Sequence, residues 1–99
     1  MTADRIAFVD DAVTDLEGLA EYIDARNPAA AVKLRDAIRA AVALLADTDP
    51  RLDTRFVTLR SGVVCQRHYV RPAVIFYRRE PGVLTVLRVF HHAREPVTR

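Results

Sequence analysis

A proline between two amphipathic stretches places the main constraint on how this chain folds. Before it, apolar positions recur at spacings of four, three and four residues: Ala12, Leu16, Leu19 and Ile23. After it, the same spacings separate Leu34, Ile38, Ala41 and Leu45. Asn27 and Pro28 suit the N-cap and first position of a second helix, and the residue before a proline is pushed out of helical geometry. Because the break is short, the sequence predicts an antiparallel helical hairpin.

Extended segments are predicted on both sides of this hairpin. Residues 5–9 form a short β-prone opening strand, and Asp10 or Asp11 after it could cap the first helix. Three β-rich runs, residues 63–69, 73–79 and 83–91, follow the hairpin with short turns between them. They predict an antiparallel three-stranded meander, and hence an α+β fold.

Two parts of the C-terminal half are less regular. Residues 51–62 form a polar connector whose short apolar piece, around Phe56, does not distinguish strand from turn. In the last run, strict alternation would place Arg88 and Phe90 on the face of Leu84, and Val89 on the opposite face.

Composition limits the class of protein. The 99 residues are 51% hydrophobic and 28% charged, so we expect one globular domain over residues 1–99. The single cysteine, Cys65, cannot form an internal disulfide, and no Cys/His spacing indicates a zinc site. Without a signal segment or a long apolar run, we expect a cytoplasmic protein that needs no membrane, metal or cofactor.

Charge is distributed unevenly along the chain. Residues 1–49 carry 5 basic and 10 acidic side chains, whereas residues 50–99 carry 10 basic and 3 acidic ones. The halves therefore have net charges of −5 and +7. Such asymmetry indicates a surface for an acidic partner. The preference for arginine, which accounts for 14 of the 15 basic residues, suits bidentate contacts but can also reflect genome base composition.

Two stretches resemble the ParE/RelE toxin superfamily of type II toxin–antitoxin systems. The first contains A-x-x-D-L at residues 12–16, Y-I at 22–23 and N-P at 27–28. The second contains I-F-Y-R at residues 75–78 and L-R-V-x-H-x-x-R at 87–94. Their order and spacing are jointly specific and cover nearly the whole chain.

The resemblance implies a RelE/ParE-like fold and a toxin neutralised by a cognate antitoxin. That antitoxin would be ParD-like, with an acidic C-terminal tail, and would lie across the helical hairpin and sheet in a hetero-oligomer. ParE-like members act on DNA gyrase, whereas RelE-like members cut mRNA in the ribosomal A site with a cluster of basic residues and often a C-terminal tyrosine or histidine.

The sequence supplies the nuclease groups poorly. Val74 stands just before the Ile-Phe-Tyr run, where RelE-like nucleases often have arginine, and no tyrosine follows Arg94. Lys33 lies in the middle of a predicted helix. In the RelE-like alternative, the catalytic set would be His91, His92, Arg94 and Arg67, because histidine can transfer a proton near neutral pH and arginine stabilises the developing phosphate charge. Adjacent strand residues point to opposite faces, so at most one of the two histidines should line a given groove.

We therefore expect a non-enzymatic gyrase inhibitor with no catalytic residues. Its candidate contacts to target or antitoxin are Arg67, Tyr77, Arg88, His91 and Arg94. Three of these residues also have a structural interpretation. Tyr77 could pack in the sheet, Arg88 could pair with a helix carboxylate, and His91 could end its strand with a hydrogen bond to the connector. Arg94 follows the strand in a flexible tail, which favours a contact role. A third possibility is a chain that has lost toxicity and persists as a binding module.

Overall fold

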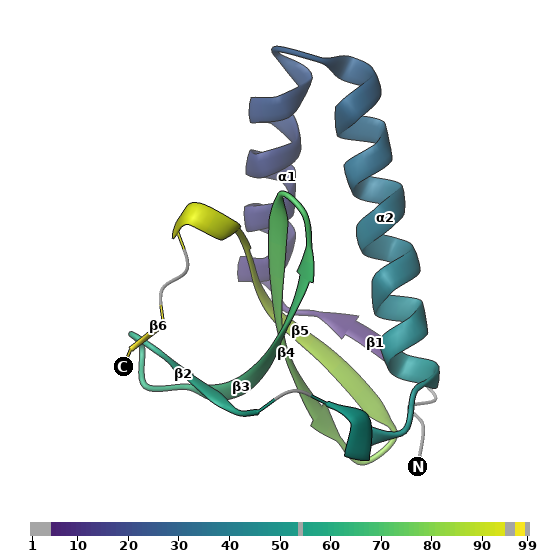
Figure 1. The fold of residues 1–99 in the computed structure, drawn as a ribbon, viewed down its shortest axis with the longest axis vertical. Helices are drawn as coiled ribbons and strands as arrows, with labels where there is room; N and C mark the ends of the chain where they lie inside the picture. Colours follow the sequence, from purple (N-terminus) through teal and green to yellow (C-terminus); the bar gives the residue numbers. More distant parts are fainter. Residues whose placement is uncertain (1–4, 54, 95–96, 99) are drawn as a thin grey trace.

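The computed structural model describes residues 5–53, 55–94 and 97–98. Its elements, in chain order, are β1 (Arg5–Phe8), α1 (Asp10–Asp24), α2 (Pro28–Asp47), the 3-10 turn η1 (Pro50–Leu52), β2 (Val57–Leu59), β3 (Val64–Val70), β4 (Ala73–Glu80), β5 (Val83–His91), the 3-10 turn η2 (His92–Arg94) and β6 (Val97–Thr98). Figure 1 shows the helices side by side, extending beyond one end of the twisted sheet. The expected α+β layout of strand, helical hairpin and antiparallel meander is confirmed.

The two helices begin in different ways. The Asn27 side chain accepts a hydrogen bond from the Ala30 N–H at 3.1 Å, with Pro28 at the first helical position, as predicted. The prediction that Asp10 or Asp11 caps α1 is wrong, because Val9 is the N-cap and offers no side-chain bond. The Val9 N–H still bonds to the Val86 carbonyl at 3.1 Å, so β1 runs directly into the helix. Both aspartates lie in the first turn, where their charge favours the helix dipole.

The sheet contains more strands than the meander. Its order is β1-β5-β4-β3-β2-β6, with β1 parallel to β5 and the other pairs antiparallel. The connector that the sequence left unassigned forms η1 and β2, and β6 pairs with the outer edge of β2. In the described part of the chain, neither helix is long and apolar enough to cross a membrane.

Apolar side chains fill both faces of this sheet. The helices pack on one face, over a cluster formed by Ala12, Leu34, Ile38, Val42, Leu45, Ala46, Ala73, Ile75, Tyr77, Leu84, Val86 and Val89. A second cluster on the other face contains Leu59, Cys65, Val74 and Phe76. The short β2 therefore contributes to a core of its own, which explains why its few residues are ordered against β3.

A bulge changes which face the end of β5 presents. The register shifts between Phe76 and Tyr77 of β4, so that β5 carries one extra residue. Val89 consequently joins Leu84 in the helix-facing cluster, while Leu87 and Phe90 pack against the other cluster. The strict alternation expected from the sequence is wrong beyond this point, because a bulge moves every following side chain to the opposite face.

Candidate functional site

A groove separates α1 from the C-terminal end of β5. We call it the α1–β5 groove, and its volume is about 610 Å³. It is lined by Thr14, Asp15, Gly18, Leu19 and Tyr22 from α1 and by Val89, Phe90, His91 and Ala93 from β5 and η2. Gly18 keeps its middle open, since a Cβ there would meet no atom within 4 Å. Tyr22 is largely exposed at one end, with the Arg26 guanidinium 4.1 Å from its ring centre.

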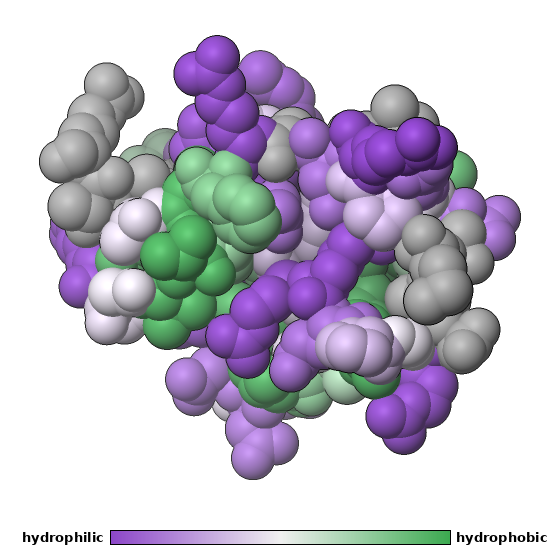
Figure 2. Space-filling view, turned by 90° about the horizontal axis from the view of Figure 1, so that it is seen from below, coloured by the Kyte–Doolittle hydropathy of each residue, from purple (hydrophilic) through white to green (hydrophobic). Residues whose placement is uncertain are grey.

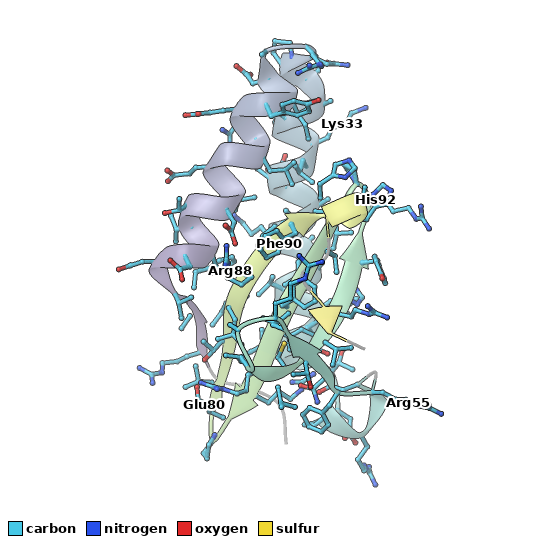
Figure 3. All side chains as sticks on the ribbon, turned by 90° about the vertical axis from the view of Figure 1, so that its left-hand side faces the viewer. Lys33, Arg55, Glu80, Arg88, Phe90 and His92 are labelled. Carbon is cyan, nitrogen blue, oxygen red and sulfur yellow. The ribbon has the colours of Figure 1, made fainter. Side chains whose placement is uncertain are left out.

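An ion pair joins the two sides of this groove. Arg88 donates from Nε to Oδ2 of Asp15 at 2.6 Å and from Nη2 to Oδ1 at 3.0 Å. The Val89 N–H donates to the same carboxylate at 3.1 Å. The Asp15 hydrogen bond raises the pKa of Arg88, and the guanidinium also lies 4.6 Å from the Phe90 ring centre. In Figure 3, Arg88 extends from β5 toward α1. The pair thus unites the A-x-x-D-L and L-R-V motifs, 73 residues apart.

The two adjacent histidines are held in different ways. Their rings stack with centres 4.5 Å apart. Nδ1 of His91 accepts a bond from the Ala93 N–H at 3.2 Å, so a neutral His91 carries its proton on Nε2. Nδ1 of His92 lies 3.0 Å from the Pro72 carbonyl oxygen and must therefore donate. Of the two, only His91 lines the α1–β5 groove. Its partner is Ala93 in η2, which replaces the connector bond considered from the sequence.

The register places Arg67 and Arg88 on the face of the sheet opposite to His91. Arg67 of β3 and Arg88 of β5 both lie opposite Phe76 of β4, which places them on one face of the sheet about 10 Å apart. His91 lies opposite Ala73, whose side chain belongs to the helix-facing cluster. Arg67 and His91 are therefore on opposite faces.

The structure describes the backbone of Arg94 and the whole of Val74, the two remaining positions considered from the sequence. The backbone of Arg94 ends the turn η2, where a flexible tail was expected, and its side chain lies outside the described part. Val74 is fully buried in the second apolar cluster. The nuclease-related position before the Ile-Phe-Tyr run thus faces the interior of this chain.

Tyr77 lies in a buried polar network that the sequence did not reveal. The residue is 1% exposed, and its hydroxyl donates to Oδ1 of Asp53 at 2.9 Å. Arg79 donates to the same carboxylate at 2.6 and 2.8 Å and to the Leu45 carbonyl at 2.9 Å. Burial and the bond to Asp53 raise the pKa of Tyr77. The side chain is buried in this fold, which favours the packing role considered from the sequence over a contact role.

The sequence contains a feature that indicates this network, but the feature is not specific. Arg78 and Arg79 stand next to each other on a strand, and alternation requires one of them to point inward. An inward arginine needs a carboxylate, since a buried charge is costly unless it is paired. The connector contains only one acidic residue after η1, Asp53. Local sequence patterns could not predict this pairing, because its partners are 26 residues apart.

A second groove lies where β1 meets the helices. We call it the β1–α1–α2 groove, and its volume is about 480 Å³. It is lined by Ile6, Phe8, Val13, Leu16, Glu17, Arg35, Ile38, Arg39 and Val42. The lining is mostly apolar, with two arginines one helical turn apart. None of these residues was predicted to be a contact from the sequence, because their apolar members also fit the predicted core face.

Among the described residues, few side chains suit metal binding or thiol chemistry. Over residues 5–53, 55–94 and 97–98, no group of three or more His, Cys, Asp or Glu residues could hold a metal ion. Cys65 is buried, and burial raises the pKa of its thiol, which keeps it protonated and unreactive.

These features describe a two-layer α+β domain with grooves between its helices and strands. Comparison with protein families gives a match to the ParE toxin of the type II toxin–antitoxin system, parDE, over residues 6–96. The chain therefore belongs to the ParE toxin family, and its class is that of toxins paired with an antitoxin. No curated protein matches it.

Proposed function

We propose that the chain is a cytoplasmic gyrase-inhibiting toxin that acts by binding and is held inactive by a ParD-like antitoxin. The match over residues 6–96 supports the toxin class. The observation that favours inhibition over RNA cleavage is the separation of Arg67 from His91 by the thickness of the sheet. Phosphodiester cleavage needs a proton-transfer group and several cations around one phosphate.

The hydrogen bonds of the histidines support the same conclusion. A general base must have a free lone pair that faces the substrate. Nδ1 of His91 already accepts from Ala93, and the other ring nitrogen carries the proton in the neutral form. His92 has a free lone pair on Nε2, yet it lies outside the α1–β5 groove. The RelE-like mRNA endonuclease is therefore the alternative and not the main proposal.

The two grooves and the basic half support antitoxin binding. An amphipathic helix binds a groove through apolar anchors three and four residues apart. The β1–α1–α2 groove offers an apolar floor with Arg35 and Arg39 beside it, which suits a helix with acidic flanks. The α1–β5 groove offers a second partly apolar surface, although its described lining contains Asp15 and no arginine or lysine. The net charge of +7 in residues 50–99 attracts an acidic tail to the molecule.

The choice between gyrase and mRNA as the target can be tested with purified components and with growth assays. We expect the protein to inhibit supercoiling of relaxed plasmid by DNA gyrase, and to leave ribosome-bound mRNA intact. Replacing His91 and His92 by alanine should leave growth inhibition within a few-fold, whereas a nuclease would lose activity by orders of magnitude. Cleavage of transcripts at codon boundaries, without any effect on supercoiling, would refute the gyrase proposal.

The antitoxin surface can be tested by filling the α1–β5 groove. Gly18→Leu introduces a side chain whose Cβ would meet no atom within 4 Å, and leucine is a better helix former than glycine. We expect the variant to fold normally and to bind the antitoxin at least tenfold more weakly in titration calorimetry. The matched control is Gly18→Ala, which barely enters the groove and should bind as the natural chain does. Equal binding by both variants would move the antitoxin to the β1–α1–α2 groove.

A further inference from the structure

A third surface lies at the end of the molecule away from the tip of the helical hairpin. This connector recess, of about 460 Å³, is lined by Pro50, Asp53, Arg55, Phe56, Gln66, Arg78 and Arg79. It shares no residue with either groove described above. Figure 2 views the molecule from the end that carries η1 and the β4–β5 turn, and shows separate hydrophobic patches among hydrophilic side chains.

The positive charge in this recess is only partly neutralised. Three arginines line it with one aspartate, and Asp53 is fully engaged by Arg79. Arg78 is half exposed, and its nearest carboxylate, on Glu80, is 3.9 Å away. No hydrogen bond or ion pair involves the side chain of Arg55 among the residues described, and Figure 3 shows it directed away from the sheet. Two guanidinium groups are therefore available to an anion.

An exposed aromatic ring stands beside these arginines. Phe56 is 67% exposed, more than any other large hydrophobic residue in the described part of the chain. Leaving such a ring in water forfeits the free energy of its burial. Gln66 is buried in the same recess, and its amide can both donate and accept hydrogen bonds. The recess thus combines a cationic rim, an apolar side and a neutral polar group.

We propose that the connector recess binds an acidic peptide segment that also carries an apolar side chain. A carboxylate would lie between Arg55 and Arg78, and the apolar side chain would pack on Phe56. Arginine forms bidentate bonds to carboxylates, and the aromatic ring supplies the apolar contact that makes a peptide site specific. The site lies apart from the grooves of the proposed function and does not depend on gyrase inhibition.

The surroundings favour a peptide over a nucleic acid. A nucleic acid presents a continuous line of phosphates and needs a basic track to follow. Here Asp53 lies within the recess, and the bond to Arg51 lowers the pKa of the neighbouring Asp49, with a smaller contribution from the Arg79 charge. The Leu45 carbonyl at the C-terminal end of α2 also points to this region, as shown by its bond to Arg79. Because both aspartates are paired, only Arg55 and Arg78 among the described lining residues remain to meet an anion, which suits a single carboxylate better than a continuous line of phosphates.

The test uses nuclear magnetic resonance with the full chain and a short synthetic peptide of alternating glutamate and leucine. We expect chemical shift changes at the backbone amides of Arg55, Phe56, Gln66 and Arg79. A peptide of alternating lysine and leucine should cause none. Replacing Arg55 and Arg78 together by alanine should weaken binding about tenfold, and Phe56→Ala should weaken it to a similar degree. Because these side chains have few structural partners, circular dichroism should show that both variants fold.

The matched control is Arg51→Ala. Arg51 lies next to the recess but is paired with Asp49 and is not among the lining residues, so its removal should leave the affinity unchanged. No binding, shift changes confined to the α1–β5 groove, or equal affinity for the double variant and the natural chain would overturn the proposal. An oligothymidylate that binds the recess in place of the peptide would also overturn it, and would assign the site to single-stranded nucleic acid.

Discussion

Two arginine–aspartate pairs of the same geometry have different roles in this protein. Both Asp15–Arg88 and Asp53–Arg79 have a closest distance of 2.6 Å between Nε and Oδ2. The side chains of Arg88 and Asp15 are 36% and 14% exposed, whereas those of Arg79 and Asp53 are 14% and 7% exposed. Burial, and not bond geometry, therefore distinguishes a pair at the rim of a groove from a pair within the core.

The further hydrogen bonds of the two ion pairs also distinguish the buried pair from the pair at the groove. Asp53 also accepts from the Tyr77 hydroxyl, and Arg79 also donates to the last turn of α2, so this pair holds the connector, β4 and α2 together. The pair at the groove holds α1 against β5 and remains in contact with water. A partner in the α1–β5 groove can reach Asp15 of this pair, but a ligand in the connector recess cannot use the Arg79–Asp53 pair without breaking the fold.

The buried pair should give the largest effect on stability. Asp53→Ala leaves the Arg79 charge and the Tyr77 hydroxyl without their partner, which we expect to lower the free energy of unfolding by about 3–5 kcal/mol. Urea unfolding measures this change. The double variant Asp53→Leu with Arg79→Met should be less destabilised than Asp53→Ala, because neither charge remains. If the double variant is the less stable of the two, the pairing is not what holds the connector.

The pair at the groove should contribute less. Asp15→Ala removes the partner of Arg88 and the acceptor of the Val89 N–H, but water can reach the partly exposed guanidinium. We expect a loss of about 1–3 kcal/mol in the free energy of unfolding, measured under the same conditions as for Asp53→Ala. A loss equal to that of Asp53→Ala would remove the distinction between the two pairs.

A helix cap supplies a reference for both values. Asn27→Ala removes the bond to the Ala30 N–H, and we expect a loss of about 1 kcal/mol. Asn27→Gly, the matched control, should cost only a few tenths of a kcal/mol relative to the natural chain. Since the cap is exposed and contacts neither pair, its effect should add to that of Asp15→Ala. A departure from additivity would indicate that the hairpin and β5 are coupled.

The smallest effect should appear as a dependence on alkaline pH. The pKa of Tyr77 is raised in the folded chain, so its hydroxyl contributes stability that is complete below the pKa of an unfolded tyrosine, about 10. The contribution decreases as pH rises above that value, because only the unfolded chain releases the proton. At about pH 10.5 we expect a loss below about 1 kcal/mol relative to pH 8. Urea unfolding of Tyr77→Phe should lack this part of the dependence, and identical slopes would contradict the buried hydrogen bond.

Local patterns accounted for most of the fold. The repeated spacings and the Asn27-Pro28 break predicted the hairpin, and short turns predicted the meander, because each signal depends on neighbouring residues alone. The bulge in β5, the strands β2 and β6, and the start of α1 at Asp10 were not predicted. Each depends on how a segment pairs or packs with another segment and not on its own pattern, and β6 pairs with β2 from far along the chain.

The candidate site also has features that the sequence predicted and features that it did not. The sequence identified Arg88 and considered a helix carboxylate as its partner, and the motif around Asp15 belonged to the same resemblance. It also placed Tyr77 among the contact residues, although the side chain is buried against Asp53. The grooves were not predicted, because their volume depends on the distance between elements and not on any one segment.

By itself, the sequence determined the order and type of the main elements, the family, and the uneven charge of the two halves. The tertiary structure alone decided which arginine faces water and which lies in the core. The physical reason is that an arginine has the same chemistry at positions 79 and 88, while the free energy of its ion pair depends on how much water the packed elements exclude.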